Sequence, residues 1–316
     1  MSDTHIPVLR ERVVELLAPA LSQPGSVCVD ATVGLGGHAG AVLAACPQAR
    51  LVGIDRDQDA LAVAGQRLAS HGDRVQLVRA RYDELPQVLA SLGTGRVQAV
   101  LLDLGLSSLQ VDRRERGFAY AVDAPLDMRM SATDPVTAAD VVNTYDVDQL
   151  TTVLRRFGEE RFAHRIASRI VAQRQHQPFE TSAQLVATIA DAIPAAARHQ
   201  GGHPAKRTFQ ALRIVVNAEL ESLAGVLPAA IAALAVGGRV AVLAYHSLED
   251  RMVKNALRAA SSDTAPRDLP VVPAGYRPQL RLLTRGAERP RPEETLTNPR
   301  AASARLRAAE RIEEAA

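Results

Sequence analysis

The sequence predicts an α/β fold, in which a doubly wound sheet is interrupted by an all-helical insertion. Two observations predict it. Between Val27 and Asp55, an apolar strand, a glycine loop, a helix and a second strand follow one another. After Val111, the alternation of strands and helices stops for roughly a hundred residues. We expect the sheet domain in residues 1–110 and 207–316, and the insertion in residues 111–206.

The first strand–helix–strand unit carries candidates for a ligand site. The run from Val27 to Val29 ends at Asp30, and the apolar run from Leu51 to Ile54 ends at Asp55. Three glycines lie between the strands: Gly34, Gly36 and Gly37. Ligands of doubly wound sheets bind at the carboxyl ends of the strands, so the two acids and the glycine loop are expected to line one site.

The position of Asp30 discriminates between possible ligands. The glycine loop followed by Asp55 also fits a dinucleotide site. There, a pyrophosphate would sit over the loop and the helix N-terminus, where the Asp30 carboxylate would repel it. S-adenosylmethionine carries a cationic amine and a sulfonium, and would be attracted instead. We therefore expect Asp30 near its amino-acid end and Asp55 at its ribose. NAD, and a glycine loop that only packs helix on strand, are the alternatives.

The third and fourth strands add two candidates. Val75–Val78 is followed by Tyr82, which could stack on an adenine, although a surface tyrosine explains it nearly as well. Val97–Leu102 is a continuous apolar strand that ends at Asp103. Its carboxyl end should face the methyl acceptor. The competing explanation for Asp103 is a solvent-facing strand terminator.

A later strand, Arg239–Tyr245, leads directly into His246. Ser247 is the expected N-cap of the next helix, with Asp250 at the capping-box spacing. His246 should therefore lie at the crevice. A lone histidine is more often structural than catalytic, and both roles are considered.

The insertion is predicted to consist of short helices and to carry a basic face. Its main helices are expected at Val136–Asn143, Val147–Phe157, Glu159–Gln175 and Ser182–Ile193. Arg161, Arg165 and Arg169 recur every four residues, which places them on one face of the third helix. They are candidates for RNA phosphate contacts, and a solvated helix face is the alternative.

The C-terminal region adds further arginines. Leu280–Leu283 is predicted as the last strand. Arg300, Arg305 and Arg307 follow it in what we expect to be a flexible tail. Such a tail suits RNA phosphates without specifying a sequence.

Composition limits the classes of function. The 316 residues are 47% hydrophobic and contain no Trp, and their net charge of +2 requires any RNA footprint to be local. Cys28 and Cys46 lack metal-site spacing, so no metal is expected. No signal peptide and no apolar run of about 18 residues is present. We therefore expect a soluble, cytoplasmic protein without a membrane anchor.

Longer motifs resemble the bacterial small-subunit rRNA (cytosine-N4) methyltransferases, known as the methyltransferase H or MraW family. The match runs nearly the whole chain. The matching segments are Asp30–His38 (DATVGLGGH), Asp55–Asp57, Asp103–Ser108 (DLGLSS), Arg116–Phe118, Pro125–Met130 (PLDMRM), Gly158–Arg161, Phe209–Ile214, His246–Arg251 (HSLEDR) and Asn298–Arg300. Ala124 stands where the family usually has Gly, and Ala119-Tyr120 where Ser-Phe is common.

The resemblance implies a Rossmann-like S-adenosylmethionine-dependent methyltransferase domain with an inserted helical domain that helps to bind substrate. The implied cofactor contacts are Gly36, Gly37, His38, Asp55, Tyr82, Asp103 and Gln110. The implied substrate is a cytidine in the decoding region of 16S rRNA, expected within the small ribosomal subunit. Whether free rRNA is also a substrate, and whether the protein forms a homodimer, are left open.

Asp103 and His246 are the candidates for a position near the cytosine amine. A hydrogen-bond acceptor there would orient the amine and help to remove its proton. The alternative from another class is a non-enzymatic RNA-binding or ribosome-assembly protein on the same fold. An assay for methyl transfer separates the two.

Overall fold

The computed structural model describes residues 6–198, 203–263 and 276–313, which form two compact units. Unit 1 combines Met1–Gly105 with Glu221–Ala316, and unit 2 is Leu106–Leu220. The boundaries between these units lie five residues before the first expected boundary, residue 110, and 14 residues after the second, residue 206. The second boundary lies later because helix α11 (Lys206–Asn217) packs on α7 (Val147–Gly158) inside unit 2.

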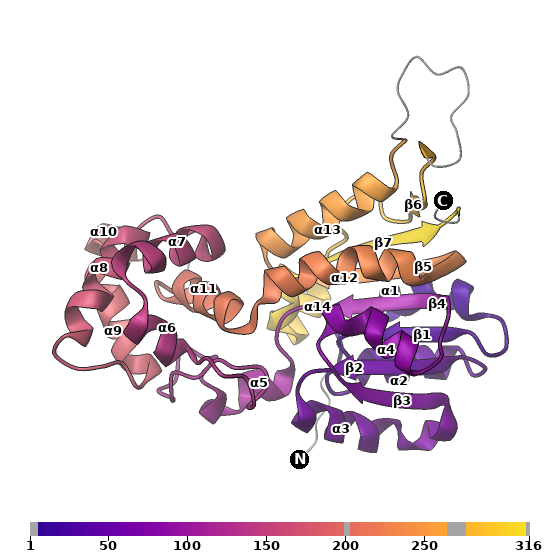
Figure 1. The fold of residues 1–316 in the computed structure, drawn as a ribbon, viewed down its shortest axis with the longest axis horizontal. Coiled ribbons are helices and arrows are strands. Elements are labelled where there is room, and N and C mark those ends of the chain that lie inside the picture. The colour runs from indigo at the N-terminus through magenta and orange to yellow at the C-terminus, as the bar shows by residue number, and fades with distance from the viewer. Residues whose placement is uncertain (1–5, 199–202, 264–275, 314–316) are drawn as a thin grey trace. The chain divides into compact units, whose positions relative to one another are not determined.

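Unit 1 contains a seven-stranded sheet in the order β3-β2-β1-β4-β5-β7-β6 (Figure 1). The strands are β1 (Val27–Asp30), β2 (Arg50–Asp55), β3 (Val75–Arg79), β4 (Val97–Asp103), β5 (Leu234–Ala244), β6 (Leu280–Leu282) and β7 (Arg305–Arg311). The first five are parallel, and β7 pairs antiparallel with both β5 and β6. The chain winds outward from β1 to β3 and resumes at β4 on the other side of β1. This reversal confirms the doubly wound, Rossmann-like fold.

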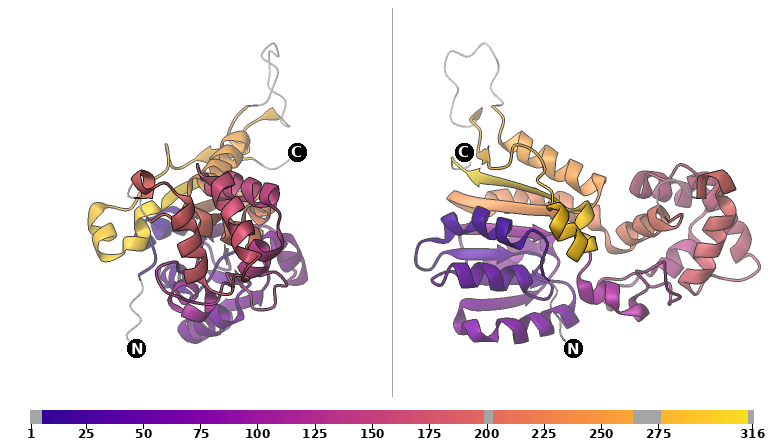
Figure 2. Two further views of the ribbon diagram at one scale, coloured as in Figure 1. Left: turned by 90° about the vertical axis from the view of Figure 1, so that its left-hand side faces the viewer. Right: turned by 180° about the vertical axis from the view of Figure 1, so that it is seen from behind.

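Helices cover both faces of the sheet. One face packs against α4 (Leu85–Ser91), α12 (Glu219–Ala233) and α13 (Ser247–Ala260). The other packs against α1 (Arg10–Leu17), α2 (Gly37–Ala45) and α3 (Gln58–Leu68), which face the viewer at the right of Figure 2. Both cores consist mainly of Val, Leu, Ile and Ala side chains. Aliphatic packing therefore replaces the aromatic residues that the composition lacks.

The C-terminal region is structured, so the prediction of a flexible arginine tail is wrong. Arg305 and Arg307 lie in β7, which pairs with β5 along six residues. α14 (Pro292–Thr297) and the 3₁₀ helix η6 (Pro299–Ser303), which carries Arg300, precede it. Leu306, Ala308 and Ala309 are fully buried, and two of these three are small, which weakened the strand pattern in the sequence.

Unit 2 is helical in the part that the structure describes. Its helices are α5 (Ser108–Asp112), α6 (Ala138–Thr144), α7 (Val147–Gly158), α8 (Ala163–Arg174), α9 (Ser182–Ala192), α10 (Ala195–Arg198) and α11 (Lys206–Asn217). α7 is the central packing element and contacts both α8 and α11. Thr181 is the N-cap of α9 and forms a capping box with Gln184.

The helix expected at Glu159–Gln175 begins later than predicted. α7 ends at Gly158, where a Cβ atom would stand 2.6 Å from the carbonyl oxygen of Arg207. Glu159 then adopts the left-handed conformation, with φ 49°, and ends α7. α8 begins only at Ala163, so Arg161 precedes the helix that carries Arg165 and Arg169.

Among the described residues, no single helix is long and apolar enough to cross a membrane. The consecutive helices α11 and α12 satisfy the length and composition criteria only when they are taken together. The same residues contain no cluster of three or more His, Cys, Asp or Glu side chains arranged to hold a metal ion.

Candidate functional site

The sheet register brings the three predicted acids to one edge of unit 1. Asp30 pairs with Gly53 of β2 and Leu101 of β4, and Asp55 and Asp103 end those two neighbouring strands. The reversal of strand order also falls between β1 and β4. The acids therefore lie at the position where doubly wound sheets bind their ligands.

The glycine loop is fastened to Asp55 through the backbone. The amide of Gly34 donates to Asp55 Oδ2 at 2.9 Å, and the amide of Asp57 donates to Oδ1 at 2.9 Å. Burial raises the pKa of Asp55 to about 6, although these two hydrogen bonds act in the opposite direction. Each carboxylate oxygen keeps a lone pair for a further donor.

Gly36 and Gly37 are required partly by packing within the protein. Gly36 has a φ of 78° and is the N-cap of α2, and a Cβ atom there would stand 3.2 Å from Leu68. A Cβ atom on Gly37 would stand 2.5 Å from Pro7 Cγ. Both glycines let other segments approach the loop closely. Packing of helix on strand therefore explains part of this motif, whatever the ligand.

Asp30 has a raised pKa because it is buried. Its side chain is 2% exposed, and Oδ1 accepts a hydrogen bond from the amide of Thr32 at 3.2 Å. Burial raises its pKa to about 7, while the nearby His38 imidazole acts to lower it. A cation placed close to Asp30 would stabilise its charged form.

Asp103 is held on both carboxylate oxygens and is still 25% exposed. The Tyr245 hydroxyl donates to Oδ1 at 2.7 Å, and His38 Nε2 lies 3.5 Å from Oδ2. The latter distance is at the limit of a hydrogen bond, so we regard this contact as mainly electrostatic. Burial lowers the pKa of His38, but the Asp103 carboxylate outweighs burial, and the pKa lies above its ordinary value.

His246 has a structural partner. It is the N-cap of α13, so the prediction of Ser247 in that role is wrong. Its Nε2 lies 3.1 Å from Glu249 Oε1, and both side chains are buried. Glu249 Oε2 accepts from the amide of Tyr245 at 2.8 Å. Glu249 rather than Asp250 completes the capping box because it occupies the third helical position.

Two further predicted cofactor contacts lie in different units. Tyr82 opens the 3₁₀ helix η3 (Tyr82–Glu84) in unit 1 and is half-buried against the hydrophobic core. Gln110 belongs to unit 2 and is 4% exposed. Its side chain accepts from the amide of Ser107 at 3.1 Å and donates to the carbonyl of Met130 at 3.5 Å.

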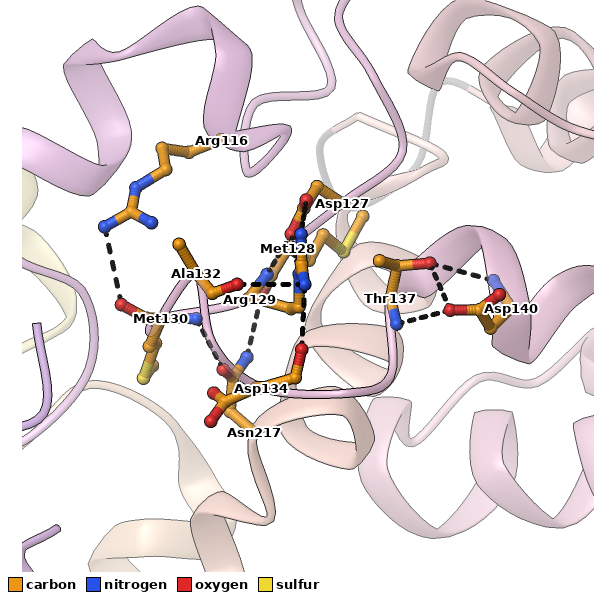
Figure 3. A network of polar contacts seen from close by, with 10 residues as sticks. All are labelled: Arg116, Asp127, Met128, Arg129, Met130, Ala132, Asp134, Thr137, Asp140 and Asn217. Carbon is orange, nitrogen blue, oxygen red and sulfur yellow. Dashed lines mark hydrogen bonds and ion pairs between the residues drawn. The ribbon is translucent and has the colours of Figure 1, made fainter.

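The loop that contains Met130 is fixed by a dense polar network (Figure 3). Asn217 donates to the Met128 carbonyl at 2.8 Å and accepts from the Met130 amide at 2.7 Å. These bonds stabilise a left-handed Met128, with φ 62°, which is unfavourable for a methionine. Arg129 is paired with Asp127 at 2.7 Å. The Pro125–Met130 motif therefore forms an ordered loop within unit 2.

The predicted basic face of unit 2 is exposed. Arg161, and Arg165 and Arg169 on α8, all reach solvent. Two further arginines that were not part of the prediction, Arg155 and Arg156 on α7, are exposed as well. The guanidinium of Arg161 lies 4.6 Å from the centre of the Phe162 ring, and that of Arg156 lies 5.1 Å from the Phe157 ring. Among the described residues, no carboxylate forms an ion pair with any of these five.

The arginines of β7, unlike those of unit 2, form ion pairs within the protein. This corrects their interpretation as part of a flexible tail. Arg305 Nη1 lies 3.0 Å from Asp250 Oδ2, and Arg307 Nε lies 2.7 Å from Asp250 Oδ1. Arg305 therefore belongs to an internal cluster rather than to a free tail. Arg300 on η6 remains exposed.

Tyr245, Thr32 and Glu249 were missed by the sequence analysis. Tyr245 immediately follows β5, and Leu243, two residues earlier, pairs with Asp103 in the sheet register. The predicted strand Arg239–Tyr245 ends at this residue, which indicates the edge of the sheet that it occupies but not its register with Asp103. The backbone amide of Asp103 also donates to Thr32 Oγ1 at 2.6 Å, a contact for which the sequence gives no signal.

A doubly wound sheet with a glycine loop and acids at the strand ends is the arrangement of nucleotide-binding α/β domains. The profile of the MraW methylase family matches residues 2–312. The chain therefore belongs to the MraW methylase family. This assignment confirms the predicted cofactor, S-adenosylmethionine, as the methyl donor.

Curated relatives agree along nearly the whole length. The ribosomal RNA small subunit methyltransferase H of Frankia alni is 64% identical, over 97% of this chain and 95% of the relative. The proteins of the same name from Saccharopolyspora erythraea and Streptomyces avermitilis are 61% and 58% identical, over 99% and 98% of this chain and 95% and 98% of the relatives.

Proposed function

We propose that this chain methylates the exocyclic N4 amine of a cytidine in the decoding region of 16S rRNA. The observation that carries the proposal is Asp103, a part-exposed carboxylate fixed at the ligand-binding edge of the sheet. The family assignment and the names of the relatives support a small-subunit rRNA substrate. The choice of the N4 amine rests on the sequence resemblance and on the chemistry that Asp103 offers.

The residues of unit 1 fit S-adenosylmethionine. Asp55 has lone pairs left for ribose hydroxyls, and the raised pKa of Asp30 leaves its charged form to be stabilised by the cofactor's cationic amine. Gly36, Gly37 and His38 open α2 beside these acids. When bound, the cofactor supplies a sulfonium methyl group whose transfer leaves a neutral thioether. Gln110 and Tyr82 remain predicted contacts.

Asp103 has the properties required for the acceptor side. The cytosine amine is a weak nucleophile because its lone pair is delocalised into the ring, and it must lose one proton as the nitrogen–carbon bond forms. A carboxylate that accepts an N–H bond orients the amine and favours loss of that proton. Much of the rate should come from this alignment. His246 remains a second candidate, although its side chain already bonds Glu249.

Unit 2 is proposed to bind the RNA. The exposed arginines around α7 and α8 can each contact a phosphate. The guanidinium groups of two of them, Arg156 and Arg161, lie over the rings of Phe157 and Phe162. The target base must leave any stack to reach a carboxylate at a strand end. Free cytidine should therefore be a poor substrate in comparison with small-subunit RNA.

The proposal is tested with small ribosomal subunits and 16S rRNA from a strain that lacks this protein. We expect methyl transfer from labelled S-adenosylmethionine to one cytidine of the decoding region, mapped as N4-methylcytidine. Methylation at a carbon atom or of another base would contradict the proposed chemistry. RNA binding without any transfer would support the rival function, a ribosome-assembly protein that retains the fold.

Asp103→Asn is the sharpest variant for the chemistry. It removes the negative charge and keeps the shape, and we expect turnover at saturating cofactor to fall about a hundredfold. Asp73→Asn, an exposed acid beside β3, is the matched control and should leave turnover unchanged. Normal turnover of Asp103→Asn would show that the charge on Asp103 is not needed.

A further inference from the structure

Tyr245 touches both ends of the turn that leaves β4. Its hydroxyl donates to Asp103 Oδ1 at 2.7 Å. Its ring lies against Gly105, where a Cβ atom would stand 3.4 Å from Tyr245 Cδ2. Gly105 has a φ of 98°, a conformation that side-chain-bearing residues rarely adopt. One side chain therefore restrains both the carboxylate and the turn that follows it.

The direction of the Tyr245 bond is fixed by chemistry. An ionised carboxylate can only accept, so the hydroxyl donates its proton to Asp103 and cannot donate it to a substrate at the same time. Charge-assisted bonds of this kind are short and strong, in agreement with the 2.7 Å distance. Burial and the negative charge of Asp103 hold the pKa of Tyr245 well above its ordinary value, so the proton stays on the hydroxyl.

The two anchors on Asp103 leave part of the carboxylate available. Tyr245 binds Oδ1, and His38 lies 3.5 Å from Oδ2. A carboxylate has about four acceptor positions, so about two remain. With 25% of the side chain exposed, the carboxylate remains accessible to a further donor. Without an anchor, rotation of the carboxylate would spread them over many directions.

We propose that Tyr245 is a positioning residue for methyl transfer, which acts through Asp103 by fixing the plane of its carboxylate. The inference rests on the proposed function, because it gives Asp103 the role of orienting the amine. Tyr245 itself touches neither cofactor nor acceptor in this scheme. Its contribution should therefore appear in turnover and vanish when the charge on Asp103 is absent.

The test is Tyr245→Phe, which removes the hydroxyl and keeps the ring on Gly105. We expect kcat for small-subunit RNA to fall about tenfold, while the Kd of S-adenosylmethionine and the thermal unfolding midpoint stay within about twofold and 2 °C of the parent. The loss is smaller than for Asp103→Asn because His38 still contacts Oδ2. Tyr276→Phe, at a 44% exposed tyrosine, is the matched control.

A double-mutant cycle distinguishes positioning from a general structural role. If Tyr245 acts through Asp103, the double variant with Asp103→Asn should turn over no more slowly than Asp103→Asn alone. Additive losses, an unchanged kcat, or a loss that disappears at saturating cofactor would each overturn the inference. If the parent protein transfers no methyl group to small-subunit RNA, the proposed function fails instead, and the parent control reveals this.

Discussion

The arginines of the C-terminal strand β7 in unit 1 and those of helices α7 and α8 in unit 2 have different surroundings. In unit 1, Arg307 and Arg305 both form ion pairs with the buried Asp250 carboxylate. Arg12 forms an ion pair with Glu288 at 2.7 Å. On α7 and α8 of unit 2, the exposed arginines bond no carboxylate among the described residues. A guanidinium that already holds a carboxylate must give it up to bind a phosphate. The partner of an arginine, rather than its presence, therefore indicates which surface is available to RNA.

The largest effect on RNA binding should come from removing the exposed arginines of unit 2. Replacing Arg161, Arg165 and Arg169 with Ala should flatten the salt dependence of RNA binding by about two units, at roughly 0.7 per contact. Affinity in about 0.1 M salt should then fall up to about a hundredfold. Fluorescence anisotropy with 16S rRNA fragments over a salt series measures both quantities, and cofactor affinity should not change.

The matched control replaces three exposed arginines of unit 1, namely Arg50, Arg67 and Arg96. Arg50 and Arg96 lie at the amino ends of β2 and β4, opposite the acids, and this triple variant should bind RNA like the parent. Equal losses in both triple variants would show that only total charge matters. An unchanged slope for the unit 2 variant would make that face a solvated helix surface.

The next largest effect is on stability. Here the paired arginines of β7, rather than the exposed arginines of α8, should matter. Arg307→Ala leaves Asp250 with a single partner, and we expect it to lower the free energy of unfolding by about 2 kcal/mol. Arg165→Ala should change the free energy of unfolding by less than about 0.5 kcal/mol. The Arg165 side chain is exposed and makes no hydrogen bond or ion pair with the residues that the structure describes. Urea unfolding followed by circular dichroism compares the two. Similar values would remove the distinction between paired and unpaired arginines.

The difference in the free energy of unfolding between the parent and Arg307→Ala should depend on pH. Burial raises the pKa of Asp250, but the bonds from Arg307 and Arg305 outweigh burial, so the pKa lies below its ordinary value. A lowered carboxyl pKa contributes stability that is present above about pH 4 and is lost as the pH falls through the folded-state pKa. The stability difference should therefore be constant from about pH 8 to 5 and shrink below about pH 4. A difference that grew in acid would contradict this assignment.

The smallest effect is expected at Arg300, the exposed arginine of η6. As a single phosphate contact it should contribute about 0.7 to the salt slope, which is about fivefold in affinity near 0.1 M salt. Arg300→Ala measures this in the same anisotropy assay. If the slope is unchanged while the unit 2 variant loses affinity, unit 1 supplies none of the tested RNA contacts.

The strand-end acids could be predicted because their positions depend on local patterns. Asp30, Asp55 and Asp103 each close an apolar strand, and parallel strands bring their ends to one edge whatever the rest of the chain does. Tyr245 was not predicted, because its partner is 142 residues away and its hydroxyl bond depends on strand register. Register between distant strands is a tertiary property that hydrophobic periodicity does not report.

The C-terminal strand β7 was not predicted, for a related reason. Arg305 and Arg307 flank Leu306, and Ala308, Ala309 and Glu310 separate Arg307 from Arg311. Such a charged, alanine-containing segment has low strand propensity. In the structure, Arg311 is 1% exposed and donates to the Ile231 carbonyl at 2.7 Å, and Arg307 binds Asp250. The charged residues of this segment therefore led to a prediction of exposure, although most of the strand is buried. Only the tertiary partners show that these arginines belong to the interior.

The place of β7 in the sheet also determines when the protein can fold during its synthesis. β7 lies between β5 and β6, so β5 has one unpaired edge until the last strand has been made. Ala244 and Arg311, which end β5 and β7, are 67 positions apart (311 − 244). At about 5–20 residues per second, translation takes roughly 3–13 s to cover that distance. Throughout that interval the nascent chain presents a bare strand edge to its neighbours.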